Sequence, residues 1–118
     1  METRIVKEKI TRARLKVLAP VEWGGLIKAA VDLEQEIIGV GGEFHSEIEA
    51  KLITEEHSLR ENTWGINLDL NQSKESESFV EFDSMINLKP LLGNKSRDVL
   101  NPETRKRIKI IIDRLISD

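Results

Sequence analysis

The sequence predicts an α+β fold: a single domain over residues 1–118, with a largely antiparallel sheet of about five strands and three helices, in the order β-α-β-β-α-β-β-α. The chain of 118 residues has the size of one domain and can bury one core. Alternating apolar and polar residues recur at strand length, and apolar residues at helical spacing follow capping signals. Connections between successive strands are too short for a helical crossover, which favours antiparallel pairing. We expect the helices mainly on one face.

The first part of the chain contains the signals of a strand, a helix and a hairpin. Apolar residues among charges at 4–10 indicate a short edge strand. Thr11 can cap a helix over 12–18, because its hydroxyl can accept a hydrogen bond from the first turn. Alternation over 27–34 and the apolar run 37–40 predict two strands joined by a turn. These strands should pair as an antiparallel hairpin.

Two further helices begin at capping signals. Ser46 and Glu49 form a capping box, which predicts a helix that ends near His57 and places His45 just before the cap. The Asn-Pro dipeptide at 101–102 marks the start of the last helix. Apolar residues then recur at the spacing of one helix face, which should close over the sheet: Ile108, Ile111, Ile112 and Leu115.

Two strands precede the last helix, and the second of them carries polar residues. The clearest alternation of the chain lies at 64–70, and a mobile polar loop should connect it to a strand over 79–88. Residues of one parity in this second strand should enter the core: Val80, Phe82, Ser84, Ile86 and Leu88. The other parity should face outward: Phe79, Glu81, Asp83, Met85 and Asn87.

The composition limits the class of function. The chain has no cysteine, which excludes a disulfide framework, a thiolate metal site and a cysteine nucleophile. No apolar run approaches the roughly 20 residues that cross a bilayer, and the first residues lack a secretory signal, so we expect a cytoplasmic protein without a membrane segment. The net charge of −3 argues against nonspecific nucleic-acid binding. The basic last helix is a separate RNA hypothesis, beside the simpler interpretation of a solvated helix face.

A polar surface forms the candidate site. The outward residues of the strand 79–88 lead into a loop of turn formers and donors at 93–98. The candidate ligand-binding residues are His45, Glu81, Asp83, Asn87, Asn94, Ser96 and Arg97. They predict a noncatalytic module that binds a small anionic ligand or a partner protein, with no cofactor. Three alternatives stay open: an ordinary loop role for His45, loop amides that satisfy their own backbone, and pairing of Arg97 with Glu81 or Asp83.

The rival hypothesis is an enzyme. Asp69, Glu81 and Asp83, with Asn67 nearby, present oxygen atoms suited to magnesium or calcium, and His45 is then the base of a metal-assisted phosphoester hydrolase. This hypothesis requires the carboxylates to converge, whereas a solvated sheet face carries the same residues without a function. Separately, the edge strands and the broad apolar side of the last helix are compatible with a homodimer.

Several segments of the chain, taken in order, resemble the successive blocks of a family of small bacterial proteins of unknown function. The segments are Gly41–His45 (Gly-Gly-Glu-Phe-His), Trp64–Leu68 (Trp-Gly-Ile-Asn-Leu), Glu81–Asn87 (Glu-Phe-Asp-Ser-Met-Ile-Asn), Lys89–Pro90 and Gly93–Arg97 (Gly-Asn-Lys-Ser-Arg). The resemblance covers nearly the whole chain. It implies a domain that stands alone, with no activity, cofactor or catalytic residue to carry over.

Overall fold

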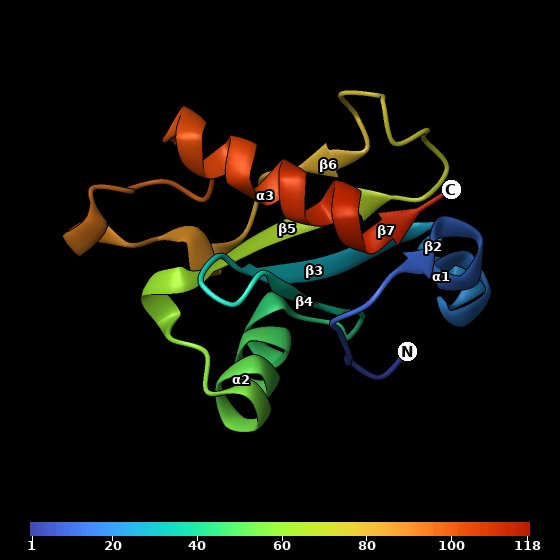
Figure 1. Cartoon of the computed structure of the whole chain (residues 1–118), viewed down its shortest axis with the longest axis horizontal. Helices are drawn as coiled ribbons and strands as arrows, with labels where there is room; N and C mark the ends of the chain where they lie inside the picture. Colours follow the sequence, from blue (N-terminus) through green and yellow to red (C-terminus); the bar gives the residue numbers. More distant parts are fainter.

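The computed structural model describes residues Met1–Asp118 and contains a five-stranded antiparallel sheet in the order β1-β4-β3-β5-β6 (Figure 1). The strands are β1 (Arg4–Val6), β3 (Leu26–Asp32), β4 (Ile37–Val40), β5 (Thr63–Asp69) and β6 (Val80–Glu81). The predicted hairpin is confirmed, since β3 and β4 pair antiparallel with Val31 opposite Ile38. The α+β class, the antiparallel sheet and the three helices are therefore as the sequence predicts.

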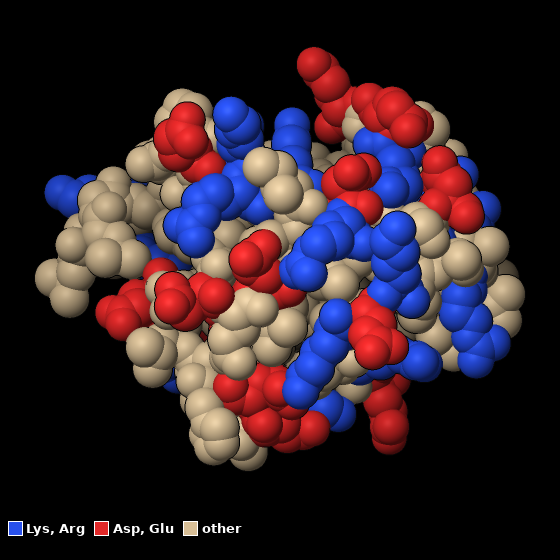
Figure 2. All heavy atoms as spheres, viewed as in Figure 1, with Lys and Arg blue, Asp and Glu red and all other residues tan.

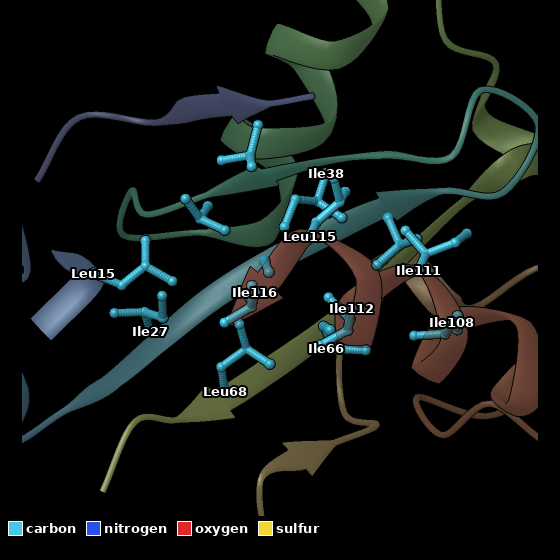
Figure 3. Close-up of a cluster of buried hydrophobic side chains, with 14 of the residues drawn as sticks. Leu15, Ile27, Ile38, Ile66, Leu68, Ile108, Ile111, Ile112, Leu115 and Ile116 are labelled. Carbon is cyan, nitrogen blue, oxygen red and sulfur yellow. The ribbon is translucent and has the colours of Figure 1, made fainter. Parts of the chain in front are cut away.

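Helix α3 covers one face of the sheet and forms the larger core with it. The three helices are α1 (Arg12–Leu18), α2 (His45–Glu56) and α3 (Pro102–Leu115). Figure 3 shows the side chains of α3 packed onto the strands, among them Ile108, Ile111, Ile112 and Leu115. A second, two-stranded parallel sheet joins β2 (Ile10–Thr11) to β7 (Ile116–Ser117), which attaches the end of α3 beside α1.

Helix α2 lies on the face opposite α3, so the expectation of helices mainly on one face holds for α1 and α3, whose side chains share the larger core, and fails for α2 (Figure 1). Ile48 and Leu52 of α2 pack with Ala30 and Ile37 in a separate, smaller cluster. Ala30 points to α2 because successive side chains of a strand alternate, while its neighbours in β3 face α3. The α2 face of the sheet is apolar only around this small cluster, whereas the α3 face carries the larger core.

The strand predicted over 79–88 is only two residues long, as β6. After it the chain turns into a 3-10 helix at Met85–Asn87, where the Ser84 hydroxyl accepts a hydrogen bond from the Ile86 amide. The predicted alternation holds for Ser84, which is buried, and Met85, which is exposed, but fails at the ends of the segment, where Phe79 and Asn87 are buried and Leu88 is exposed. Asn87 points inward because side chains three residues apart lie on the same side of a 3-10 turn, which places Asn87 on the side of the buried Ser84.

The Asn87 side chain replaces the missing part of β6. Its Oδ1 accepts a hydrogen bond of 2.7 Å from the Gly65 amide, and its Nδ2 donates one of 2.9 Å to the Gly65 carbonyl. A side-chain amide thus pairs with the edge of β5 as the peptide group of a neighbouring strand would. Gly65 allows this close approach, since a Cβ there would lie 2.5 Å from the Ser84 Cβ.

Helix α2 begins without the predicted capping box. Phe44 occupies the N-cap and makes no side-chain cap hydrogen bond, so His45 is the first helical residue and Ser46 is not the cap. Glu49 is buried and accepts a hydrogen bond from the Thr63 hydroxyl. Contacts with β5 therefore decide how this helix begins, against the local capping signal.

Candidate functional site

A pocket of about 780 Å³ lies over β3, β5 and β6, beside the N-terminal end of α2. Its polar lining comes from these strands, from α2 and from the segment after β6: Lys28, His45, Asn67, Glu81, Asp83 and Arg97. The volume falls in the range that is common for sites of small ligands. Four of the seven candidate residues, His45, Glu81, Asp83 and Arg97, are thus brought together.

Strand register places the polar residues in a row across the sheet. Lys28 of β3 lies opposite Asn67 of β5, and Asn67 lies opposite Glu81 of β6. Lys28 has the same parity as Ala30, which packs against α2, so the row stands on the α2 face. The N-terminal end of α2 adds His45 beside the row. The floor of the pocket is therefore set by strand pairing.

Hydrogen bonds fix two of the acidic groups. The Asn67 Nδ2 donates to Glu81 Oε1 at 3.0 Å and to the Asp83 carbonyl oxygen at 3.0 Å. The Arg97 Nε donates to Asp83 Oδ1 at 2.7 Å. The alternative that Arg97 pairs with an acidic residue of the strand is confirmed for Asp83. This ion pair is half-exposed, so it contributes little to stability, and it uses only the Nε of the Arg97 guanidinium.

Lys28 is the free cation of the pocket. The chain provides no hydrogen bond or ion pair to its Nζ, although its charge is close enough to affect the ionisation of His45. Lysine commonly keeps its ammonium group hydrated or pairs it with an acid. An unpaired ammonium on the wall of a concave site is therefore available to a ligand.

His45 is a buried neutral donor. Its Nε2 lies 2.8 Å from the Ile66 carbonyl oxygen and donates a hydrogen bond to it, which leaves the lone pair on Nδ1. Burial lowers the pKa of His45 below its ordinary value of 6.5, helped by the charge of Lys28, while the Ile66 hydrogen bond opposes the change. The ring therefore remains neutral at pH 7.

This lowered pKa predicts a loss of stability in acid. The unfolded chain binds the proton at about pH 6.5, whereas the folded chain resists it, so the free energy of unfolding should fall as pH drops below about 6.5. Urea unfolding at pH 7.5 and 5.5 should show a smaller loss for His45→Gln than for the wild type. His57→Asn, at an exposed position with φ of 58°, is the matched control and should retain the full loss. Equal losses in all three proteins would contradict the prediction.

Asn87 and Asn94 face the interior, which corrects their expected place on a ligand surface. Asn94 is buried, and its Nδ2 donates to the carbonyl oxygens of Asn87, Ser96 and Asp98. Its Oδ1 accepts from the Leu100 amide. The alternative that loop amides satisfy their own backbone describes Asn94, whereas Asn87 bonds the backbone of β5. Ser96 lies outside the pocket lining, and its hydroxyl accepts from the Asp98 amide.

The expected metal site is not formed. Asp69, Glu81 and Asp83 all line the pocket, but no three acidic, histidine or cysteine side chains of the chain converge to hold one ion. Each carboxylate has its own partner: Asp69 accepts from the Asn71 amide, as Glu81 does from Asn67 and Asp83 from Arg97. The three carboxylates therefore do not converge as the metal hypothesis requires.

Lys28 is the site residue that sequence reasoning missed. Its parity in the strand was visible, because it alternates with buried residues on both sides. The register that places it beside Asn67 depends on the pairing of β3 with β5, between which α2 intervenes in the chain. No local pattern carries that information.

Two of the five basic side chains of α3, Arg105 and Arg114, pair with acidic groups. Figure 2, viewed as in Figure 1, shows Lys and Arg side chains over α3 with acidic side chains between them. Arg105 pairs with Asp98, and Arg114 lies 3.9 Å from Glu36. These pairs reduce the free positive charge on this face. None of the helices combines the length and the apolar character that a membrane span requires.

The fold and the pocket define a small α+β domain with a surface pocket of mixed charge between an antiparallel sheet and the first turn of a helix. The model of one protein family, described as Protein of unknown function (DUF5674), matches residues 4–115. The chain belongs to this family. No curated protein and no solved structure matches it.

Proposed function

We propose that the protein is a noncatalytic binding module whose pocket takes a small organic anion. The observation that carries the proposal is the unpaired ammonium group of Lys28 on the wall of a concave site. Trp23, Leu26 and Val80 add apolar surface to the same pocket, which suits the carbon skeleton of a small ligand. The cation can pair with the anionic group of a ligand, and the apolar surface beside it can contact the carbon skeleton.

A small carboxylate fits better than a phosphate or a partner protein. Phosphate groups are commonly held by several donors or by a bidentate arginine, and the one arginine of the pocket already pairs with Asp83. A partner protein needs a broad surface, whereas the free cation stands within a cavity. A metal-assisted hydrolase is less well supported, because the three carboxylates that would hold its metal ion do not converge.

Calorimetric titration with propionate, 4-methylpentanoate, benzoate and inorganic phosphate tests the proposal. We expect at least one carboxylate to bind, and Lys28→Met to weaken it about tenfold, because methionine keeps the apolar stem and removes the charge. Lys106→Met, on the exposed side of α3, is the matched control and should bind as the wild type does. Absence of carboxylate binding to the wild type, or equal binding to both variants, would overturn the proposal.

A further inference from the structure

The pocket is lined by more acidic than basic side chains, so a ligand that also carries a positive group would match it better than a simple anion. Two permanent cations, Lys28 and Arg97, line it together with five carboxylates: Glu43, Asp69, Glu77, Glu81 and Asp83. Arg97 is neutralised by Asp83, so Lys28 faces the remaining acids alone. A simple anion would gain one attraction and meet several repulsions. The other half of the ligand should therefore be positive.

We propose that the ligand is a zwitterion of the amino-acid class, either a free amino acid or a short peptide. Its carboxylate pairs with Lys28, and its ammonium group pairs with Glu81 and Asp69. This inference rests on the proposed function and adds the second charged group of the ligand. Asn67 stands between the two halves and orients Glu81 through its Nδ2.

The row on the sheet separates the two charges by the right amount. Lys28, Asn67 and Glu81 lie on three neighbouring strands, so the Cα atoms of Lys28 and Glu81 are about 10 Å apart. Lys28 forms no ion pair with Glu81 across this gap. The gap between the two side chains leaves room for a molecule with opposite charges a few ångströms apart.

Each charged residue keeps atoms for the ligand. Asn67 donates a hydrogen bond to Glu81 Oε1, and the Asn71 amide donates one to Asp69 Oδ1. The other oxygen of each carboxylate has no partner within the chain. An ammonium group has three donors and can take both oxygens. Together with the Lys28 ammonium, these atoms form two half-sites of opposite sign within one cavity.

The cavity also sets the size of the ligand. A volume of about 780 Å³ exceeds a single amino acid and accommodates a short peptide as well. Trp23, Leu26 and Val80 line it and favour an apolar side chain. L-Leucine and L-leucyl-L-leucine are therefore suitable probes, and they distinguish a free amino acid from a peptide.

Matched analogues remove one charge at a time. We expect one of the two probes to bind at least tenfold more tightly than its N-acetyl derivative, which lacks the ammonium group, and its amide, which lacks the carboxylate. The inference fails if, for both probes, the N-acetyl derivative and the amide bind as tightly as the probe itself. Binding of 4-methylpentanoate with dependence on Lys28 would leave the proposed function intact in that case.

Glu81→Gln gives an effect of opposite sign on the two kinds of ligand. Glutamine can still accept the Asn67 hydrogen bond, so the variant loses the charge and keeps the local structure. The variant should bind the zwitterion about tenfold more weakly. It should bind 4-methylpentanoate equally or more tightly, since a repulsion is removed. Glu8→Gln, at an exposed position away from the pocket, is the control. Unchanged binding of the zwitterion by Glu81→Gln would overturn the inference.

Discussion

Asn87→Ala should lower the free energy of unfolding by about 3 kcal/mol, because it removes two buried hydrogen bonds to Gly65 and a third, part-buried one to the Arg97 carbonyl. The Gly65 amide and carbonyl would lose their partners along the edge of β5, while the Arg97 carbonyl would keep only the Ser84 amide. Alanine cannot replace them, and the cavity it leaves is closed to bulk water because Asn87 is fully buried. Urea unfolding followed by circular dichroism measures the loss.

Asn101→Ala is the matched control for this change. Asn101 is exposed and caps α3 by accepting hydrogen bonds from the amides of Glu103 and Thr104. Its loss should cost about 1 kcal/mol, the usual cost of removing an N-cap. If Asn87→Ala costs no more than this control, the buried amide does not replace a strand as the structure indicates.

Gly65→Ala should destabilise the protein by about 2 to 3 kcal/mol, because the added methyl group has no space. A Cβ at this position would lie 2.5 Å from both Cβ and Oγ of Ser84 and 2.9 Å from Ile86 Cγ1. The segment after β6 would have to move away from β5, which would also stretch the Asn87 hydrogen bonds. The unfolding midpoint in urea should fall accordingly.

A double-mutant cycle with Ser84→Gly separates this clash from other effects of alanine. Removal of the Ser84 side chain takes away two of the close contacts, so Gly65→Ala should cost at least about 1 kcal/mol less in the Ser84→Gly background. Ser84→Gly alone has a cost of its own, because the hydroxyl accepts from the Ile86 amide. Additive costs would show that the contact with Ser84 does not limit this position.

Local signals were sufficient where an element depends on its own sequence. Thr11 caps α1 by accepting from the Arg14 amide, and α1 spans the predicted residues 12–18. The apolar spacing of α3 identified the side chains that enter the core. Capping and periodicity act within one or two turns, so a single sequence displays them in full.

Long-range contacts decide the elements that were predicted wrongly. The path of the segment after β6 depends on the hydrogen bonds between the Asn87 side chain and Gly65, which is 22 positions earlier in the chain. Helix α2 begins at His45 because that side chain is held by the Ile66 carbonyl on the neighbouring strand. The same dependence on register explains the site: the acidic residues were visible, whereas the proximity of Lys28 to them was not.

The two buried asparagines shape one wall of the pocket before any ligand arrives. Asn87 ties the segment after β6 to β5, and Asn94 ties the following loop to itself, so Asp83 and Arg97 stand on a supported backbone. A preorganised wall loses little conformational entropy when a molecule enters. A rigid wall of this kind also contributes to selectivity, because it does not rearrange to accommodate a ligand of the wrong shape.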